Sequence, residues 1–310
     1  ILYYMTKEKW GGHLAILTTN LIFGFNTPIA KTIVPEWISP YGLTSIRMVF
    51  AALVFWGINL FTVQERVTKK DLFILFWGGV FGLIGAQLSF ANALRFTSPV
   101  NISIIAAMTP IAVMLLAALV LKEPISWKKA IGVTLGASGA LLIILCSSHG
   151  QTGKGSLIGN LLCVVNVVTY AIYLVITRPI SQRYSPVTLM KWMFLFAAII
   201  AIPLGIRELP EARMFSTEAG WHIWWRLAYV VMIATGVAYI LVPMALKRIR
   251  PTTASMYNNV QPIVASAIAI FIGQDIFTWD KPLAALMVFS GVYLVTQSKA
   301  KDDERLTDKR

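Results

Sequence analysis

Charged residues are scarce in this sequence of 310 residues. Lys, Arg, Asp and Glu make up 13% of the chain and hydrophobic residues 57%, whereas soluble domains carry roughly 25% charged residues. So few charges exclude a surface that faces water on all sides. The net charge is +13, but Lys and Arg gather in short segments between apolar runs, with no nucleic-acid recognition motif. We therefore expect membrane lipid as a partner and no nucleic acid.

Residues that carry enzyme chemistry are also few. The chain has two cysteines and three histidines, and Cys146 and Cys163 lie inside apolar runs, which argues against a disulfide framework. It has no HExxH, GxSxG, CxxC or Walker A motif, so zinc proteolysis, serine hydrolysis and self-contained ATP-driven pumping have no support. We expect no enzyme activity, no catalytic residue, no cofactor and no metal.

Acidic residues avoid the centres of the apolar runs. All fourteen Asp and Glu lie in loops, in the termini or at the edges of those runs. A carboxylate inside the membrane is the usual device of proton relays and cation-binding sites. Its absence disfavours a proton-driven exporter of cationic drugs.

Apolar runs long enough to cross a membrane recur along the chain. A helix needs about 20 residues to cross the hydrocarbon core. We predict ten transmembrane helices at 13–33, 40–62, 71–93, 98–121, 128–146, 155–178, 187–207, 221–246, 251–272 and 281–297. If the N-terminus lies inside, most of the Lys and Arg of the connecting segments lie inside as well, which predicts that both termini are cytoplasmic. The expected location is a bacterial inner membrane.

The second half of the chain repeats the first. At an offset of 152 residues, Pro99 matches Pro251, Pro110-Ile111 matches Pro262-Ile263 and Trp127 matches Trp279. An offset of 147 relates the first helices of the two halves. Five helices per half require the second half to enter the membrane from the opposite side, and loop 122–129 is more basic than its equivalent 274–281. Inverted repeats are typical of transporters.

The repeat gives five predicted parts. They are a cytoplasmic N-terminal segment at 1–12, a five-helix repeat at 13–146, an extracytoplasmic linker at 147–154, an inverted five-helix repeat at 155–297 and a cytoplasmic tail at 298–310.

The junction of the fourth and fifth predicted helices, LVLKEPISWKKAIGVTLGASGALLI at 119–143, has an acidic residue and a proline followed by a glycine-rich helix. In this junction, in the Ile22-Phe23-Gly24-Phe25-Asn26 segment and in the Pro40…Arg47 spacing, the chain resembles the EamA family of the drug/metabolite transporter superfamily. The second-half junction, Gly273-Gln274-Asp275, departs from the pattern because no proline follows it. The resemblance implies a ten-helix exporter or importer of small metabolites.

Small residues and prolines predict where helices pack and bend. Gly132-x3-Gly136 and Gly78-x3-Gly82 allow close approach of helix backbones. Pro110 and Pro262 interrupt equivalent helices, and we expect paired hinges there, with static kinks as the alternative.

Polar side chains at helical spacing predict the binding site. Such groups are unfavourable in lipid unless they face protein or water, so stripes of them indicate either a central cavity or hydrogen bonds that join helices. The candidate substrate-binding residues are Thr19, Phe23, Asn26, Gln87, Ser103, Asn166, Tyr170, Tyr173, Tyr239, Ser255, Asn258 and Asn259. Asn20 and Gln261 rank lower because they sit off the main stripes.

Two cations fall within predicted helices. Arg47 lies about two turns inside the outer end of its helix, where it would snorkel outward, bond carbonyls at a kink, or meet a substrate anion. Lys191 lies near the inner end of its helix, where snorkelling is expected.

These features predict a secondary transporter, an exporter, of small neutral or zwitterionic metabolites such as amino acids. It would work by alternating access around a polar and aromatic cavity, as a monomer or homodimer. The alternatives are a proton-coupled efflux carrier for drugs or other metabolites, and a membrane scaffold that transports nothing.

Overall fold

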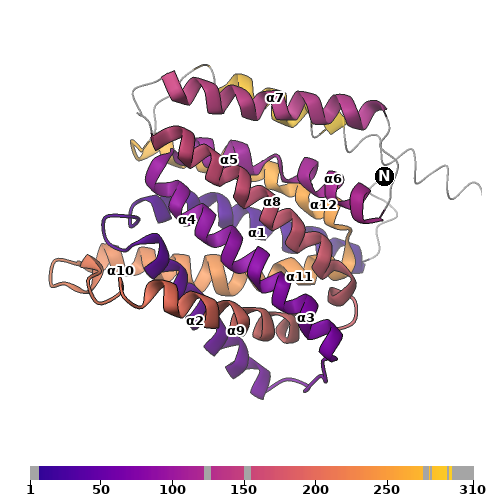
Figure 1. The fold of residues 1–310 in the computed structure, drawn as a ribbon, viewed down its shortest axis with the longest axis vertical. Helices are drawn as coiled ribbons and strands as arrows, with labels where there is room; N and C mark the ends of the chain where they lie inside the picture. Colours follow the sequence, from indigo (N-terminus) through magenta and orange to yellow (C-terminus); the bar gives the residue numbers. More distant parts are fainter. Residues whose placement is uncertain are drawn as a thin grey trace, which may run out of the picture.

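The computed structural model describes residues 7–121, 127–149, 155–274, 279, 281–291 and 293–294. Every regular element within these ranges is a helix (Figure 1). Six helical segments are long and apolar enough to cross a membrane: Pro40–Leu60, Lys69–Phe96, Pro99–Val120, Leu157–Ser181, Pro186–Gly205 and Trp221–Arg248. Two shorter apolar helices cover Ala130–Gly139 and Lys281–Gly291. The all-helical, multi-pass architecture expected from the sequence is confirmed.

The first half of the chain contains seven α-helices and one π-helix. They are α1 (Lys7–Lys31), α2 (Pro40–Leu60), α3 (Lys69–Gly78), π-helix η2 (Gly79–Gly85), α4 (Ala86–Phe96), α5 (Pro99–Ala106), α6 (Thr109–Leu121) and α7 (Trp127–His149). The helices α3, η2 and α4 follow one another without an intervening loop, so together they form one span, Lys69–Phe96. The linker predicted at 147–154 lies mostly outside the described residues.

The second half follows the same order. It contains α8 (Gly155–Ser181), α9 (Pro186–Gly205), the short 3₁₀ turn η3 (Arg213–Phe215), α10 (Trp221–Ala228), π-helix η4 (Tyr229–Val237), α11 (Ala238–Arg248), α12 (Pro251–Met256), 3₁₀ turn η5 (Tyr257–Asn259) and α13 (Val260–Phe271). The helix Lys281–Gly291 follows.

Serine–proline pairs fix where several helices begin. Ser39, Ser98 and Ser185 each accept a hydrogen bond from a backbone amide in the first turn of the helix that follows, and each precedes a proline at the first helical position. Serine satisfies an otherwise unpaired amide there, and proline has no amide to satisfy. The helices α2 and α9 therefore start in the same way at equivalent places in the two halves.

Equivalent glycines make equivalent contacts in the two halves. A Cβ atom on Gly12 would lie 2.9 Å from Cβ of Arg248, and one on Gly159 would lie 2.8 Å from Cβ of Thr97. In each case the first helix of one half crosses the end of the third helical span of the other half, at a point where only glycine lets the backbones approach. The contact occurs twice, as a duplicated arrangement requires.

The two π-helices are also equivalent. At the offset of 152, η2 at Gly79–Gly85 corresponds to 231–237 within η4. Two further helices are interrupted at matching points: α5 ends at Ala106 before α6, and η5 separates α12 from α13. These interruptions lie just ahead of Pro110 and Pro262, and the hinge role of the two prolines stays a prediction.

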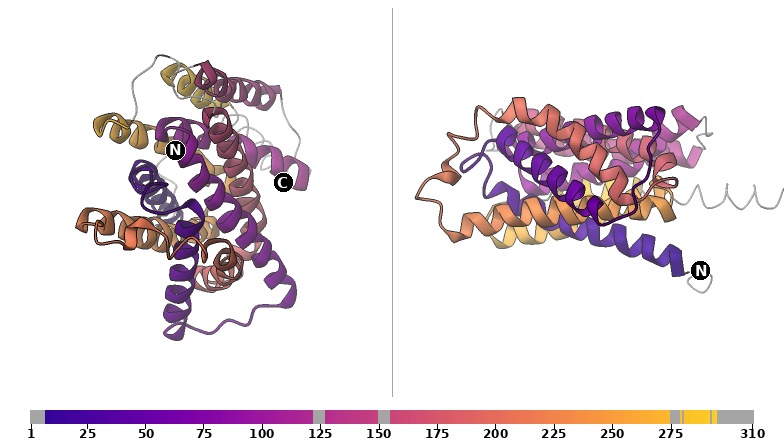
Figure 2. Two further views of the ribbon diagram at one scale, coloured as in Figure 1. Left: turned by 60° about the vertical axis from the view of Figure 1, so that its left-hand side comes forward. Right: turned by 90° about the horizontal axis from the view of Figure 1, so that it is seen from below.

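The predicted glycine contacts are present. The helix α7 lies against the helix Lys281–Gly291 at one edge of the bundle (Figures 1 and 2), where a Cβ on Gly291 would lie 2.5 Å from the Gly132 carbonyl oxygen and 2.6 Å from the Gly136 backbone nitrogen. Gly78 and Gly82 face Met193 and Tyr173. The packing prediction for both glycine pairs is therefore confirmed.

Candidate functional site

A cavity lies where the two halves meet. It measures about 70 Å³ and its wall is built from α1, α2, α4, α5, α6, α8, α11, η5 and α13. The lining residues are Phe23, Asn26, Thr27, Arg47, Ala86, Gln87, Phe90, Ala106, Thr109, Asn166, Tyr170, Tyr239, Asn258 and Gln261.

The cavity contains more than half of the candidate residues and also some that the sequence reasoning missed. The predicted residues in its wall are Phe23, Asn26, Gln87, Asn166, Tyr170, Tyr239 and Asn258, together with Arg47. The polar residues that the stripes missed or ranked low are Thr27, Thr109 and Gln261. The repeat itself carried a signal for two of them, because Thr109 and Gln261 are equivalent at the offset of 152.

The other candidates lie outside the wall. Thr19 is fully buried and donates a hydrogen bond to the Ala15 carbonyl at 2.9 Å. Tyr173 is fully buried beside Tyr170, and the centroids of the two rings are 5.6 Å apart. Ser103 and Ser255 are buried as well. The Oδ1 atom of Asn259 is buried away from the cavity wall.

The centre of the cavity wall joins two equivalent residues. The side-chain amide of Gln87 donates a hydrogen bond to the hydroxyl of Tyr239, and the two positions correspond at the offset of 152. Residues related by a pseudo-two-fold axis can touch each other only close to that axis. The ring of Tyr239 stands edge-on between Phe23 and Phe194, each with a centroid distance of 5.8 Å. The cavity therefore lies where equivalent residues of the two halves meet.

Arg47 is buried in the wall and does not snorkel. Its side chain is 1% exposed, and its Nε atom donates to the Thr235 hydroxyl at 2.7 Å. That hydroxyl donates in turn to the Val230 carbonyl at 2.9 Å, a contact within η4. No carboxylate occurs among the lining residues. Since a buried cation needs a partner, the guanidinium is suited to bind an anionic group that enters the cavity.

Two acceptors in the wall have no hydrogen-bond donor. The Oδ1 atom of Asn26 and the Oε1 atom of Gln87 are buried and have no protein partner. An unsatisfied buried acceptor is destabilising by about 1–3 kcal/mol, so both atoms suit a ligand that brings N–H or O–H groups. The wall thus offers a cation and neutral acceptors to one small molecule.

The cavity is smaller than a metabolite pocket. A volume of about 70 Å³ holds a few water molecules, and pockets for small organic ligands are usually about 300–1,000 Å³. In this conformation the cavity therefore leaves little room for a metabolite.

Lys191 behaves differently from the expectation. It is 4% exposed, so it does not snorkel, and its Nζ atom donates to Asn59 Oδ1 at 2.9 Å. The indole rings of Trp56 and Trp192 lie 5.3 and 5.8 Å from the same atom. Cation–π contacts of this kind stabilise a desolvated ammonium.

Metal binding has no structural basis in the described ranges. No group of three or more His, Cys, Asp or Glu side chains there could hold an ion.

The comparison with protein families decides the classification. The model of the EamA-like transporter family matches residues 10–145 and again residues 157–297. The chain belongs to the EamA-like transporter family. This is a family of transporters and not of enzymes, so the expectation of no enzyme activity is confirmed, and so is the resemblance found in the sequence.

Several relatives of this EamA-like chain are also named as transporters. It is 22% identical over 304 residues to the uncharacterized transporter YetK of Bacillus subtilis, covering 96% of this chain and 91% of the relative. It is 23% identical to the uncharacterized transporter YyaM of the same species, covering 90% and 92%. A WAT1-related protein of Arabidopsis thaliana is 21% identical, covering 97% and 83%.

A solved crystal structure has the same fold. It aligns with a TM-score of 0.67 and 17% sequence identity, over 93% of this chain and 98% of the other. The EamA-like transporter family implies a small-molecule solute as the ligand of this protein.

Proposed function

We propose that this EamA-like protein is a secondary carrier, acting as an exporter, for small neutral or zwitterionic metabolites such as amino acids. The observation that carries the proposal is the cavity wall, where buried Arg47 has no carboxylate beside it and Asn26 and Gln87 offer unpaired acceptors. A carboxylate of the solute would pair with the guanidinium, and its ammonium or hydroxyl groups would donate to the amide oxygens.

The proposed architecture has ten spans in two repeats, 13–146 and 155–297, inserted in opposite directions. The duplicated glycine contacts and the equivalent π-helices support it. Both termini would face the cytoplasm of a bacterial inner membrane, because the basic loops then lie inside. Reporter fusions at each end test this orientation, and activity of the two fusions on different sides of the membrane would refute it.

Alternating access follows from the small size of the cavity. A metabolite needs more room than about 70 Å³, so one repeat would tilt against the other around the central site. Candidate positions outside the wall, such as Thr19, Ser103 and Tyr173, would act in this proposal by packing helices.

Counterflow in proteoliposomes tests the function. The purified protein is reconstituted with a panel of unlabelled amino acids inside and labelled ones outside, beside cationic drugs and dicarboxylates as contrasting classes. We expect accumulation of at least one zwitterionic amino acid. Counterflow of the cationic drugs alone would refute the assignment in favour of a drug carrier.

A further inference from the structure

Two equivalent helical arms lie at opposite ends of the bundle. The helix α3 lies at the end that holds the start of α1, and α10 lies at the other end (Figure 1). At the offset of 152, Lys69 at the start of α3 corresponds to Trp221 at the start of α10. In the orientation proposed above, α3 lies at the cytoplasmic face and α10 at the outer face.

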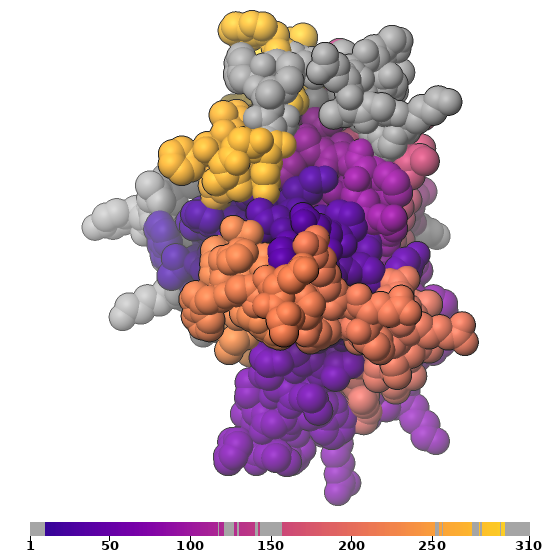
Figure 3. Space-filling model, turned by 90° about the vertical axis from the view of Figure 1, so that its left-hand side faces the viewer, coloured from indigo at the N-terminus to yellow at the C-terminus, as the bar shows by residue number. Residues whose placement is uncertain are grey.

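The two arms are packed differently. The helix α3 lies along both α8 and α9, whereas α10 makes only a slight contact with α1, the equivalent of α8. Figure 3 shows the end of the bundle at which α10 lies. In a protein built from inverted repeats, such a difference between equivalent ends indicates which side is closed. Here the cytoplasmic arm lies along two helices of the other half, whereas the outer arm meets α1 only slightly and packs Ile223 and Leu227 into an apolar cluster with Ile33 and Ile38 of the first half.

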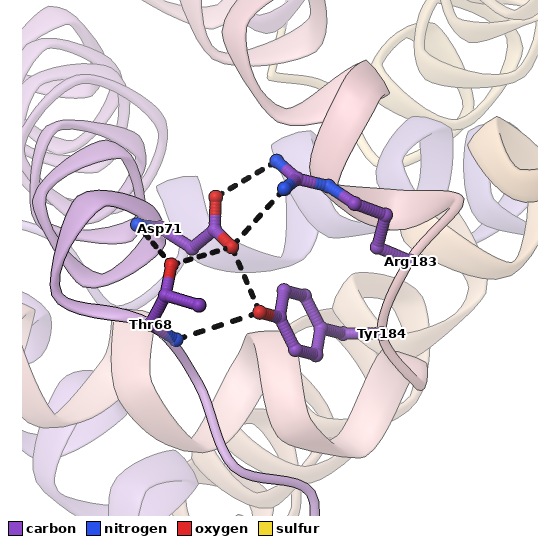
Figure 4. Close-up of polar contacts among 4 residues, drawn as sticks. All are labelled: Thr68, Asp71, Arg183 and Tyr184. Carbon is purple, nitrogen blue, oxygen red and sulfur yellow. Dashed lines mark hydrogen bonds and ion pairs between the residues drawn. The ribbon is translucent and has the colours of Figure 1, made fainter.

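A cluster around the carboxylate of Asp71 joins the cytoplasmic arm to the other half, and the Arg183 side chain in it is 53% exposed. The carboxylate of Asp71 is 2% exposed and accepts hydrogen bonds from Arg183 at 2.7 and 3.2 Å and from the Tyr184 hydroxyl at 2.8 Å (Figure 4). Thr68, which caps α3, donates to the same carboxylate at 2.9 Å. Asp71 and Thr68 belong to the first half, and Arg183 and Tyr184 to the second. The cluster therefore joins the two halves.

A second carboxylate strengthens the same junction. Glu65, just ahead of α3, accepts hydrogen bonds from the backbone amide and the hydroxyl of Ser185 at 2.9 and 3.0 Å. Ser185 caps α9. Two acidic groups of the first half are thus bound to the connection between α8 and α9.

The equivalent junction at the outer face is weaker. Arg213 approaches Glu36 at 3.3 Å, and the two side chains are 50% and 65% exposed. One backbone hydrogen bond, from the Met214 amide to the Trp37 carbonyl at 3.0 Å, adds to it. The Arg213 guanidinium also lies 5.0 Å from the centre of the Trp37 ring. Exposed ion pairs contribute little, and neither partner of the Arg213–Glu36 pair is buried as Asp71 is.

Each arm leads directly into a π-helix. The helix α3 ends at Gly78, where η2 begins, and α10 ends at Ala228, where η4 begins. π-Helical turns are rare, they occur often at functional sites, and they are one of the recognised causes of bending in helices. Both π-helices end within two residues of the equivalent residues Gln87 and Tyr239 of the cavity wall.

We propose that α3 and α10 are the two gates of the carrier, that each swings about the π-helix that follows it, and that the Asp71–Arg183–Tyr184 cluster holds the cytoplasmic gate shut in this conformation. The proposal rests on the carrier function proposed above. The opposite state would release Asp71 from Arg183 and bring α10 against α1.

Distance measurements test the proposal without any substrate. In the full-length protein, with Cys146 and Cys163 replaced by alanine, spin labels are placed at Lys70 on α3 and at Gln182 before α9, both exposed positions. Pulsed electron resonance then gives the distance across the cytoplasmic junction. We expect Asp71→Asn to add a longer population, with a shift in the open-to-closed ratio of about tenfold.

A second label pair tests the π-helical joint. Arg95 at the end of α4 lies beyond η2 on the same span as α3, and Leu161 lies near the start of α8, which packs along α4. Both residues are exposed. If the joint is at η2, this distance stays constant while the Lys70–Gln182 distance lengthens. Equal lengthening of both pairs would overturn the joint and indicate rigid tilting of the whole span.

Matched variants separate the gate from simple unfolding. Tyr184→Phe keeps the ring and removes the hydroxyl, which donates to Asp71 and accepts from the Thr68 amide, but it leaves the Arg183–Asp71 ion pair in place. It should therefore give a smaller shift than Asp71→Asn in a protein of normal thermal stability. Exchanging the charges, Asp71→Arg with Arg183→Asp, should restore much of the short distance. Glu218→Gln removes an exposed partner of Arg213 and should leave the cytoplasmic distance unchanged.

The decisive adverse result is an unchanged Lys70–Gln182 distance in both Asp71→Asn and Tyr184→Phe. That result would refute the gate whether or not the protein exchanges amino acids. Conversely, a failure of counterflow with a normal response of the label pair would refute the proposed substrates and leave the gate standing.

Discussion

Replacing Arg47 by methionine gives the sharpest test of the binding site. Methionine has similar length and fills the same space without charge or donors. A hydrogen bond to a charged group contributes about 1.5–3 kcal/mol, so losing one between Arg47 and a carboxylate should weaken binding by about 10- to 150-fold. The wall offers no second cation to compensate.

The assay compares an amino acid with its carboxamide, which keeps the size and loses the negative charge. In counterflow, the wild-type protein should prefer the amino acid, and Arg47→Met should bring the two half-saturation concentrations close together. Arg47→Lys keeps the charge but not the planar fork, so it should retain part of the preference.

The control for Arg47 is its protein partner. Thr235→Val removes the hydroxyl that accepts the Nε hydrogen bond and leaves the cation in place. If Thr235→Val abolished the preference for the carboxylate as fully as Arg47→Met, the role of the guanidinium would be to hold η4 in place and not to bind the substrate. An unchanged preference in Arg47→Met would refute a contact with the substrate altogether.

Three further outcomes test packing, pH response and the gate. Gly82→Ala should lower the stability by about 1–3 kcal/mol because the new methyl group overlaps the Tyr173 ring, whereas Gly57→Ala, with nothing within 4 Å, should be neutral in the same thermal assay. Burial raises the pKa of Glu65, but hydrogen bonds from Thr188 and Ser185 outweigh it and hold that pKa below its ordinary value. The contribution of Glu65 to the stability of the folded protein is therefore complete above the ordinary carboxyl pKa, and it is lost as the pH falls through the lowered pKa. Melting temperatures should fall over that acidic window, less so in Glu65→Gln. The label pair across the cytoplasmic junction supplies the third outcome, given above.

The helices were predictable because lipid imposes them. A run of about 20 apolar residues has few alternatives to a helix in a membrane, and serine–proline pairs such as Ser39-Pro40 and Ser185-Pro186 fix where helices start. The π-helices were not predictable. A π-helical turn differs from an α-helical one by a single added residue, and the segment GVFGLIG at 79–85 has no side chain that requires it.

The cavity was predictable by helix and less so by side chain. Tyr170 and Tyr173 lie on neighbouring positions of one helical face, yet Tyr170 lines the cavity and Tyr173 packs on Gly82. A polar stripe marks the side of a helix that avoids lipid, and that side includes both cavity and helix contacts. Whether a polar residue lines the cavity or packs between helices depends on how closely the neighbouring helix approaches it.

Arg47 and Lys191 illustrate the same point for charges. Position near the end of a helix favoured snorkelling for both, but each has a partner on another helix, Thr235 and Asn59. Snorkelling is favourable only when no nearer group can stabilise the cation. Thr235 lies 188 residues from Arg47 in the sequence, and Asn59 lies 132 residues from Lys191. No local sequence pattern therefore reveals either partner.

The charges at the two junctions show how equivalent loops of the two halves can diverge and still form an ion pair with the other half. Glu36 and Arg183 are equivalent at the offset of 147 and carry opposite charges. Each forms an ion pair with the other half, Glu36 with Arg213 and Arg183 with Asp71. In the proposed inverted arrangement basic residues favour the cytoplasmic side, so the same loop is basic in one half and less basic in the other. The partners of Glu36 and Arg183 are not equivalent to each other, because at the offset of 152 Asp71 corresponds to Ile223 and Arg213 corresponds to Phe61. Each loop is therefore paired with the other half through a different position. The midplane is free of this charge bias, and there the equivalent residues Gln87 and Tyr239 stay neutral and bond to each other.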